Sequence, residues 1–148
     1  MARLDRAKQE DGMGIMVAVD NSEYSLKAVE KAIEMARLQG GEMTVISVAL
    51  ELPDIEEIPV SYGEKLKDQA LRAVRKATEM AENAGIRVEA RVEVGTSPAE
   101  NIVNLAYELK TNLIVIGHRG ITGIGRFLIG SVAGRVVAHA PCSVLVVK

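Results

Sequence analysis

The residues best suited to ligand chemistry lie in one glycine-rich segment, GHRGITGIGRFLIGS, at positions 117–131. Five of these fifteen residues are glycine, and glycine lets a backbone approach a ligand without a Cβ in the way. The segment ends in Gly130-Ser131 at a predicted helix start, where unpaired N–H groups and a partial positive charge favour an anion. Arg119 and Arg126 add positive charge. The segment therefore predicts a phosphate-binding site, although a surface loop that needs glycine only to turn is the alternative.

A second polar group, Asp20-Asn21-Ser22, stands directly after an apolar run. A carboxylate such as Asp20 can accept hydrogen bonds from base or sugar groups. The alternative is a structural turn, because Ser22 can cap the helix that follows. His118 is a candidate phosphate donor, with a solvated loop histidine as the other interpretation. Cys142 is the single cysteine, so no intrachain disulfide or cysteine-based zinc site can form.

The glycine-rich segment does not match the common phosphate-binding motifs. It lacks the Gly-Lys-Ser/Thr of a P-loop, and the sequence after the first apolar run, where a dinucleotide fingerprint would begin, is DNSEYS. A receiver domain would need an acidic cluster and a lysine after the fifth strand, and the sequence fits that interpretation poorly. If the segment binds phosphate, it therefore does so through a different motif.

Five apolar segments predict the strands that position these loops. Four are short and mostly apolar, as expected of strands in a parallel sheet covered on both faces. The other alternates strictly between apolar and charged residues, which favours an edge strand with one wet face. The mostly apolar segments span 14–19, 43–50, 112–117 and 142–148, and the alternating segment spans 86–94.

Helices are predicted between these strands. Ser22 can cap the first of them. Ser61 and Glu64 have capping-box spacing at the start of the second. The third begins in the sequence SPAE at 97–100, which offers a cap, a proline at the first helical position and a glutamate three residues after the cap. The fourth is predicted over 130–140.

Strands and helices alternate as βαβαβαβαβ, which predicts an α/β fold: a doubly wound five-stranded parallel sheet with helices on both faces. With 86–94 as an outer edge and 112–117 beside 14–19, the strand order is 3-2-1-4-5. Ligands bind such sheets beyond the carboxyl ends of the strands, where the winding direction reverses. Asp20 and Gly117 follow the two strands that flank this point, so we expect both candidate loops to meet there.

Length and composition limit the remaining possibilities. A chain of 148 residues that is 48% hydrophobic can build one core, and we expect 14–148 to form a single domain after a poorly ordered extension at 1–13. An aromatic content of 3% and a net charge of −2 argue against nucleic-acid binding. No apolar run approaches the ~18 residues of a membrane span, and the first residues lack a signal-peptide core, so we predict a cytoplasmic protein without membrane contact.

The net charge averages two different regions. Residues 1–109 contain 13 Lys and Arg against 20 Asp and Glu, a balance of −7. Residues 110–148 contain five basic residues and no acid, a balance of +5. The region without negative charge is the region that contains the glycine-rich segment, which favours an anionic ligand.

The spacing Gly117-x2-Gly120-x9-Gly130-Ser131 resembles that of the universal stress protein family. The resemblance extends over nearly the whole chain from Met16. It includes VAVDNSEYS after the first strand, VISVAL in the second, GTSPAENIVNLA at the third helix and the ending HAPCSVLVVK.

This resemblance implies an ATP-binding protein, with Mg²⁺ or Mn²⁺ as candidate companions of the nucleotide. The residues implied to bind the nucleotide are Val19, Asp20, Val48, Gly117, Gly120, Gly130, Ser131 and Val132, and the candidate phosphate contacts are His118, Arg119 and Arg126. The aliphatic members would enclose adenine without aromatic stacking. The resemblance also points to a homodimer through strand 142–147, and pairing would cover its otherwise exposed aliphatic edge.

Three function hypotheses follow. The first is a nucleotide-dependent regulatory or switch module in a stress response, because the glycine pattern is intact and no general base is evident. The second is a slow ATPase or a nucleotidyl or phosphoryl transferase. The third is a nucleotide-free dimer that acts as an interaction scaffold, for which the acidic loop 51–60 is a candidate contact with a protein partner.

Overall fold

The computed structural model describes residues 13–119 and 128–148. Residues 1–12 of the predicted extension lie outside the described residues. So do two candidate site residues, Gly120 and Arg126.

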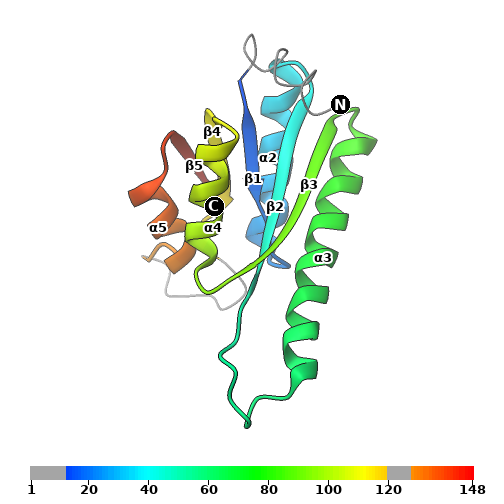
Figure 1. The fold of residues 1–148 in the computed structure, drawn as a ribbon. Helices are drawn as coiled ribbons and strands as arrows, with labels where there is room; N and C mark the ends of the chain where they lie inside the picture. Colours follow the sequence, from blue (N-terminus) through cyan, green and yellow to red (C-terminus); the bar gives the residue numbers. More distant parts are fainter. Residues whose placement is uncertain (1–12, 120–127) are drawn as a thin grey trace.

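In the described part of the chain, five parallel strands form one sheet in the order β3-β2-β1-β4-β5 (Figure 1). The strands are β1 (Ile15–Ala18), β2 (Glu42–Leu50), β3 (Arg87–Gly95), β4 (Leu113–Gly117) and β5 (Ser143–Val147). β1 is paired with β2 and with β4, and all pairings are parallel. The predicted doubly wound α/β sheet and its strand order are therefore confirmed.

The helices cover both faces of this sheet. They are α2 (Glu23–Leu38), α3 (Val60–Asn83), α4 (Pro98–Glu108) and α5 (Ser131–His139). One buried cluster contains side chains of α2 and α3, and the other contains side chains of α4 and α5. Along β1 the side chains alternate between these clusters: Ile15 and Val17 belong to the first, Met16 and Ala18 to the second. This double burial explains why β1 has a continuous apolar sequence.

Two of the predicted helix starts are confirmed and one is wrong. Ser22 caps α2 by accepting a hydrogen bond from the N–H of Ser25. Ser97 caps α4 in the same way, by accepting a hydrogen bond from the N–H of Glu100. α3 instead begins at Val60, with Pro59 at the N-cap position and no side-chain cap. The N–H of Tyr62 already donates to the carbonyl of Pro59, so the helix starts before Ser61 can cap it.

The sheet has its two edges at β3 and β5. β3 was expected to bury one face, but that face is covered only in part: Val88 is half-buried against the α2–α3 cluster, whereas Val92 and Val94 are 40% and 43% exposed. The alternating pattern therefore identified the edge strand correctly and overestimated how far α3 covers it. None of the helices described is both long and apolar enough to cross a membrane.

Candidate functional site

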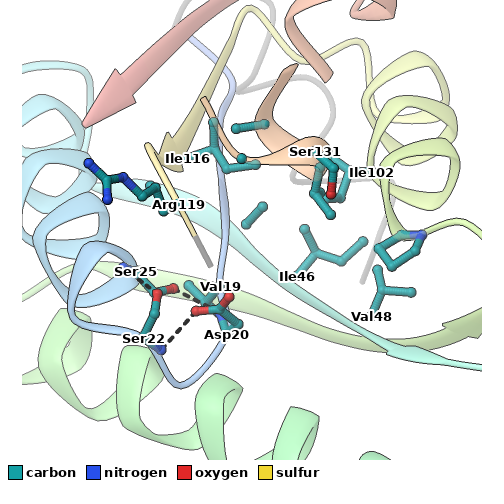
Figure 2. Close-up of a pocket in the computed structure, with 16 residues that line it drawn as sticks. Val19, Asp20, Ser22, Ser25, Ile46, Val48, Ile102, Ile116, Arg119 and Ser131 are labelled. Carbon is teal, nitrogen blue, oxygen red and sulfur yellow. Dashed lines mark hydrogen bonds between the residues drawn. The ribbon is translucent and has the colours of Figure 1, made fainter. Parts of the chain in front are cut away.

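A cavity of about 250 Å³ lies at the carboxyl ends of β1 and β4 and against Ile46 and Val48 within β2 (Figure 2). Its walls come from these strand ends, the first turn of α2 and the starts of α4 and α5. The lining residues are Ala18, Val19, Asp20, Ser22, Ser25, Ile46, Val48, Pro98, Ile102, Ile116, Gly117, Arg119, Gly130, Ser131, Val132 and Ala133. The cavity therefore occupies the switch point between β1 and β4, where the topology predicted a ligand site.

One side of the cavity is aliphatic. Ile46 and Val48 from β2 lie opposite Ile102 from α4 (Figure 2). These side chains form a slot without aromatic rings, which suits a flat apolar group held by dispersion and burial.

Hydrogen bonds hold the loop after β1 in one conformation. The N–H of Ser22 donates to Oδ1 of Asp20 at 2.8 Å, and the N–H of Asp20 donates to Oγ of the buried Ser25 at 2.8 Å. Figure 2 shows both bonds beside the cavity. The turn interpretation of Asp20 is therefore correct, and the same carboxylate also lines the cavity, so the two interpretations are compatible.

Gly117 ends β4 directly against the first turn of α2. A Cβ at this position would lie 2.9 Å from the carbonyl carbon and the Cβ of Tyr24, closer than side chains approach one another in folded proteins. Gly117 is thus required by packing as well as being a lining residue.

α5 begins at the cavity without a side chain that caps it. Gly130 is its N-cap residue and makes no side-chain hydrogen bond to the helix, whereas Ser22 and Ser97 cap α2 and α4. The backbone N–H of Gly130 donates to the carbonyl of His118 at 2.9 Å, which ties the start of α5 to the end of β4. Gly130, Ser131 and Val132 line the cavity, so the start of α5 and its unpaired N–H groups are placed where an anion could bind.

Positive charge lies on the α2 side of the cavity. Arg119 lines the cavity, and its guanidinium carbon is 5.6 Å from the centroid of the Tyr24 ring. Lys27 places its Nζ 5.5 Å from the same centroid, and the His118 ring is 6.3 Å from it. Among the described residues that line the cavity, Asp20 is the one acidic residue.

Most of the sequence-predicted site residues described by the structure are brought together. Those that line the cavity are Val19, Asp20, Val48, Gly117, Arg119, Gly130, Ser131 and Val132. His118 lies beside it, against Tyr24, and is not a lining residue. In the described ranges, no group of three His, Cys, Asp or Glu side chains is placed to hold a metal ion.

Sequence reasoning missed several lining residues. Ser25 gave a weak signal, since it lies three residues after the capping Ser22. Ile102 and Ile116 were indistinguishable from ordinary core residues, because apolar periodicity reports burial but not whether a cavity lies beyond the side chain.

A doubly wound sheet with a cavity at its switch point defines a class of α/β ligand-binding proteins. The model of the universal stress protein family matches residues 13–148. The chain belongs to this family.

Individual proteins agree with the family match. A universal stress protein of Methanocaldococcus jannaschii is 37% identical over 139 residues, which cover 90% of this chain and 81% of that protein. The structure of universal stress protein UspA from Lactobacillus plantarum has a TM-score of 0.80 at 25% identity and covers 92% of this chain and 97% of its own. The universal stress protein from Archaeoglobus fulgidus, solved in complex with dAMP, has a TM-score of 0.71 at 28% identity, covering 93% and 99%.

Proposed function

We propose that this chain binds ATP in the cavity at the switch point and acts as a nucleotide-dependent regulatory module in a cytoplasmic stress response. The observation that carries the proposal is a single cavity that joins an aliphatic slot to the uncapped start of α5. A nucleotide has the matching pair of properties, a flat base at one end and an anionic phosphate chain at the other.

The backbone of β2 supports adenine as the base. Ile46 accepts a hydrogen bond from the N–H of Val19, and β1 ends at Ala18. Because residues two apart in a strand present their N–H and C=O groups to the same side, Val48 presents its own groups beyond the end of β1. This donor and acceptor pair matches the acceptor and donor on the edge of adenine, and the aliphatic slot would enclose the ring.

The opposite end of the cavity suits phosphates. Gly130 has a φ of −59°, which any residue can adopt, so its backbone conformation does not require glycine. Close approach of a ligand to the start of α5 would require it. Ser131 would donate its hydroxyl to a phosphate, and Asp20, between the two ends, would accept from the ribose.

The dAMP complex of the Archaeoglobus fulgidus protein supports an adenine nucleotide here. The longer phosphate chain of ATP is part of our proposal. Mg²⁺ or Mn²⁺ would enter with the nucleotide, since phosphate oxygens are good ligands for such hard cations.

We further propose that the chain forms a homodimer through β5. This strand is a sheet edge with half-buried valines. Val137 on α5 is 49% exposed, and Ile129, two residues before α5 begins, is 39% exposed. Pairing two copies of this edge across a two-fold axis would satisfy the free backbone groups and cover the apolar side chains.

Native mass spectrometry of the freshly purified chain tests nucleotide and stoichiometry together. We expect a dimer that carries nucleotide, and a rise in the melting temperature when millimolar ATP is added to the stripped protein. Protein without nucleotide that shows no thermal shift would sink the proposal, and a bare dimer would favour the scaffold hypothesis.

The variant Gly130→Asp places a side chain and a negative charge where the phosphate is proposed to bind. We expect it to abolish the thermal shift with ATP. Gly63→Asp is the matched control, because Gly63 lies on α3 with open space around it and outside the cavity lining. If ATP still raises the melting temperature of Gly130→Asp, the phosphates do not bind at the start of α5.

A further inference from the structure

The basic residues on the α2 side of the cavity share one aromatic partner. Lys27 and Arg119 both lie within 6 Å of the centroid of the Tyr24 ring, so their charges are no more than about 11 Å apart. That upper bound is comparable to the screening length of ~8–10 Å at physiological ionic strength, so both charges add to the positive potential around the Tyr24 ring. We call Tyr24, Lys27, His118 and Arg119 the α2 basic group.

A hydrogen bond joins the arginine and the histidine of this group. Nε of Arg119 donates to Nδ1 of His118 at 3.4 Å. Tyr24 is half-buried and Lys27 is exposed, which puts the group at the border between the cavity and solvent.

The charge environment favours an anion at this border. Lys27 makes no ion pair with any residue that the structure describes; its ammonium lies over the ring instead. Cation–π contacts at exposed sites are weak and leave the charge of the ammonium in place, so Lys27 can still attract an anion. An anion within reach of Lys27 and Arg119 would form charge-assisted hydrogen bonds with both.

We propose that the α2 basic group is a second phosphate subsite that receives the distal phosphates of a nucleoside triphosphate. It would make the cavity discriminate nucleotides by the length of the phosphate chain. This inference rests on the proposed function, because it needs the base and the first phosphate to occupy the cavity. The start of α5 then holds the phosphate nearest the ribose, and Arg119, which lines the cavity, leads the chain toward Lys27.

Tyr24 has a positioning role in this subsite. Its ring orients both cations, and its backbone is fixed by the close contact with Gly117. A phenyl ring presents the same π face, so Tyr24→Phe should retain discrimination, whereas Tyr24→Leu should lose much of it.

Isothermal titration of the stripped, full-length chain with ATP, ADP and AMP tests the subsite. We expect wild-type protein to bind ATP at least roughly 10-fold more tightly than AMP, because ATP makes additional charge-assisted contacts. Lys27→Gln should weaken ATP binding by roughly 3- to 10-fold and AMP binding by less than about 2-fold, and raising the salt concentration should shrink the ATP advantage.

The control is Lys31→Gln, which makes the same charge change on the same helix. Lys31 pairs with Glu34 at 3.1 Å and takes no part in the α2 basic group, so this variant should keep the wild-type ratio of ATP to AMP affinity. Equal affinities for ATP and AMP in wild-type protein, or equal losses for both nucleotides in Lys27→Gln, would overturn the subsite and leave the proposed function intact. No binding of any nucleotide would instead overturn the proposed function.

Discussion

Gly117 combines two constraints in one residue, because it lines the cavity and packs against the backbone of Tyr24. We predict that Gly117→Ala destabilises the protein by ~1–3 kcal/mol even without nucleotide, since a methyl group forced into a packed contact shifts the surrounding backbone. Urea unfolding of the stripped protein measures this.

Gly63→Ala is the control for Gly117→Ala. An added Cβ at Gly63 meets nothing within 4 Å, and alanine is the better helix former by ~1 kcal/mol. Gly63→Ala should therefore be neutral or stabilising. If the two variants unfold at the same urea concentration, Gly117 is not held by packing.

Cys142 provides a pH-dependent prediction. Burial against the α4–α5 cluster raises the pKa of its thiol, and a backbone hydrogen bond at Ile114 lowers it by less. A raised pKa leaves less thiolate at a given pH, and the thiolate is the reactive form. We expect iodoacetamide to alkylate native Cys142 more slowly than the urea-unfolded chain, with the rate rising at a higher pH than in that chain. Native alkylation as fast as in urea would contradict this.

Residue types alone predicted the polar part of the site better than its apolar part. Asp20 was found because a carboxylate directly after a buried strand is unusual, and Gly130 because it stands in a glycine-rich segment at a predicted helix start. Ile102 and Ile116 were not, because an isoleucine beside a cavity and one in a filled core give the same periodicity. The packing of Gly117 against Tyr24 was also beyond sequence reasoning, since it depends on the approach of two elements 93 positions apart in the chain.

At the scale of elements, the hydroxyl of Ser97 links the cap of α4 to α5, beside an ion pair of Arg135 with Glu100 at 3.9 Å. Oγ of Ser97 accepts from the N–H of Glu100 and, at 3.2 Å, from Nη1 of Arg135 on α5. We predict that Ser97→Ala lowers the free energy of unfolding by ~1 kcal/mol through loss of the cap. A cycle with Arg135→Gln should show coupling of roughly 0.5 kcal/mol, because both interactions use the same oxygen.

Ser22→Ala is the control that separates the loss of a helix cap from the loss of the hydrogen bond between Ser97 and Arg135. Ser22 caps α2 through Ser25, so its loss should cost a similar amount. It should show no coupling with Arg135→Gln, because Ser22 and Arg135 share no partner among the bonds described. Equal coupling in both cycles would show that Ser97 acts only as a cap.

The order of the elements could be predicted because each signal was local and strong. A cap followed by proline located α4, and a continuous apolar run located β1. The predicted start of α3 was wrong because the helix begins after Pro59 at the N-cap position, without any side-chain cap. The capping-box pattern at Ser61 cannot reveal a start of this kind. The exposure of Val92 depends on how much of β3 is covered by α3. That is a property of the tertiary structure, and the alternation of residues along one strand cannot predict it.

At the scale of the whole molecule, the fold brings two oppositely charged parts of the chain to one cavity. Asp20 comes from residues 1–109, with a balance of −7, and Gly130 comes from the acid-free remainder. The acid-free part forms the phosphate end of the proposed site, whereas the loop after β1 offers the acceptor for a sugar. The net charge of −2 therefore hides an uneven distribution of charge along the chain. That distribution matches the proposed ligand, whose phosphates would meet the basic part and whose sugar would meet Asp20.

The open edge of β5 gives a prediction about assembly. The carbonyl of Val147 accepts from the N–H of His118, so Val147 presents its backbone groups to the β4 side. Because these groups alternate in direction along a strand, those of Val146 point to the open edge.

We predict that Val146→Pro removes an edge donor, leaves the β4–β5 pairing intact and converts the proposed dimer to a monomer. Light scattering after size exclusion measures the mass, and circular dichroism checks the fold. Val146→Thr keeps the N–H and should stay dimeric. A folded Val146→Pro dimer would show that the copies associate elsewhere, and a monomeric wild-type chain would show that this edge is left unpaired.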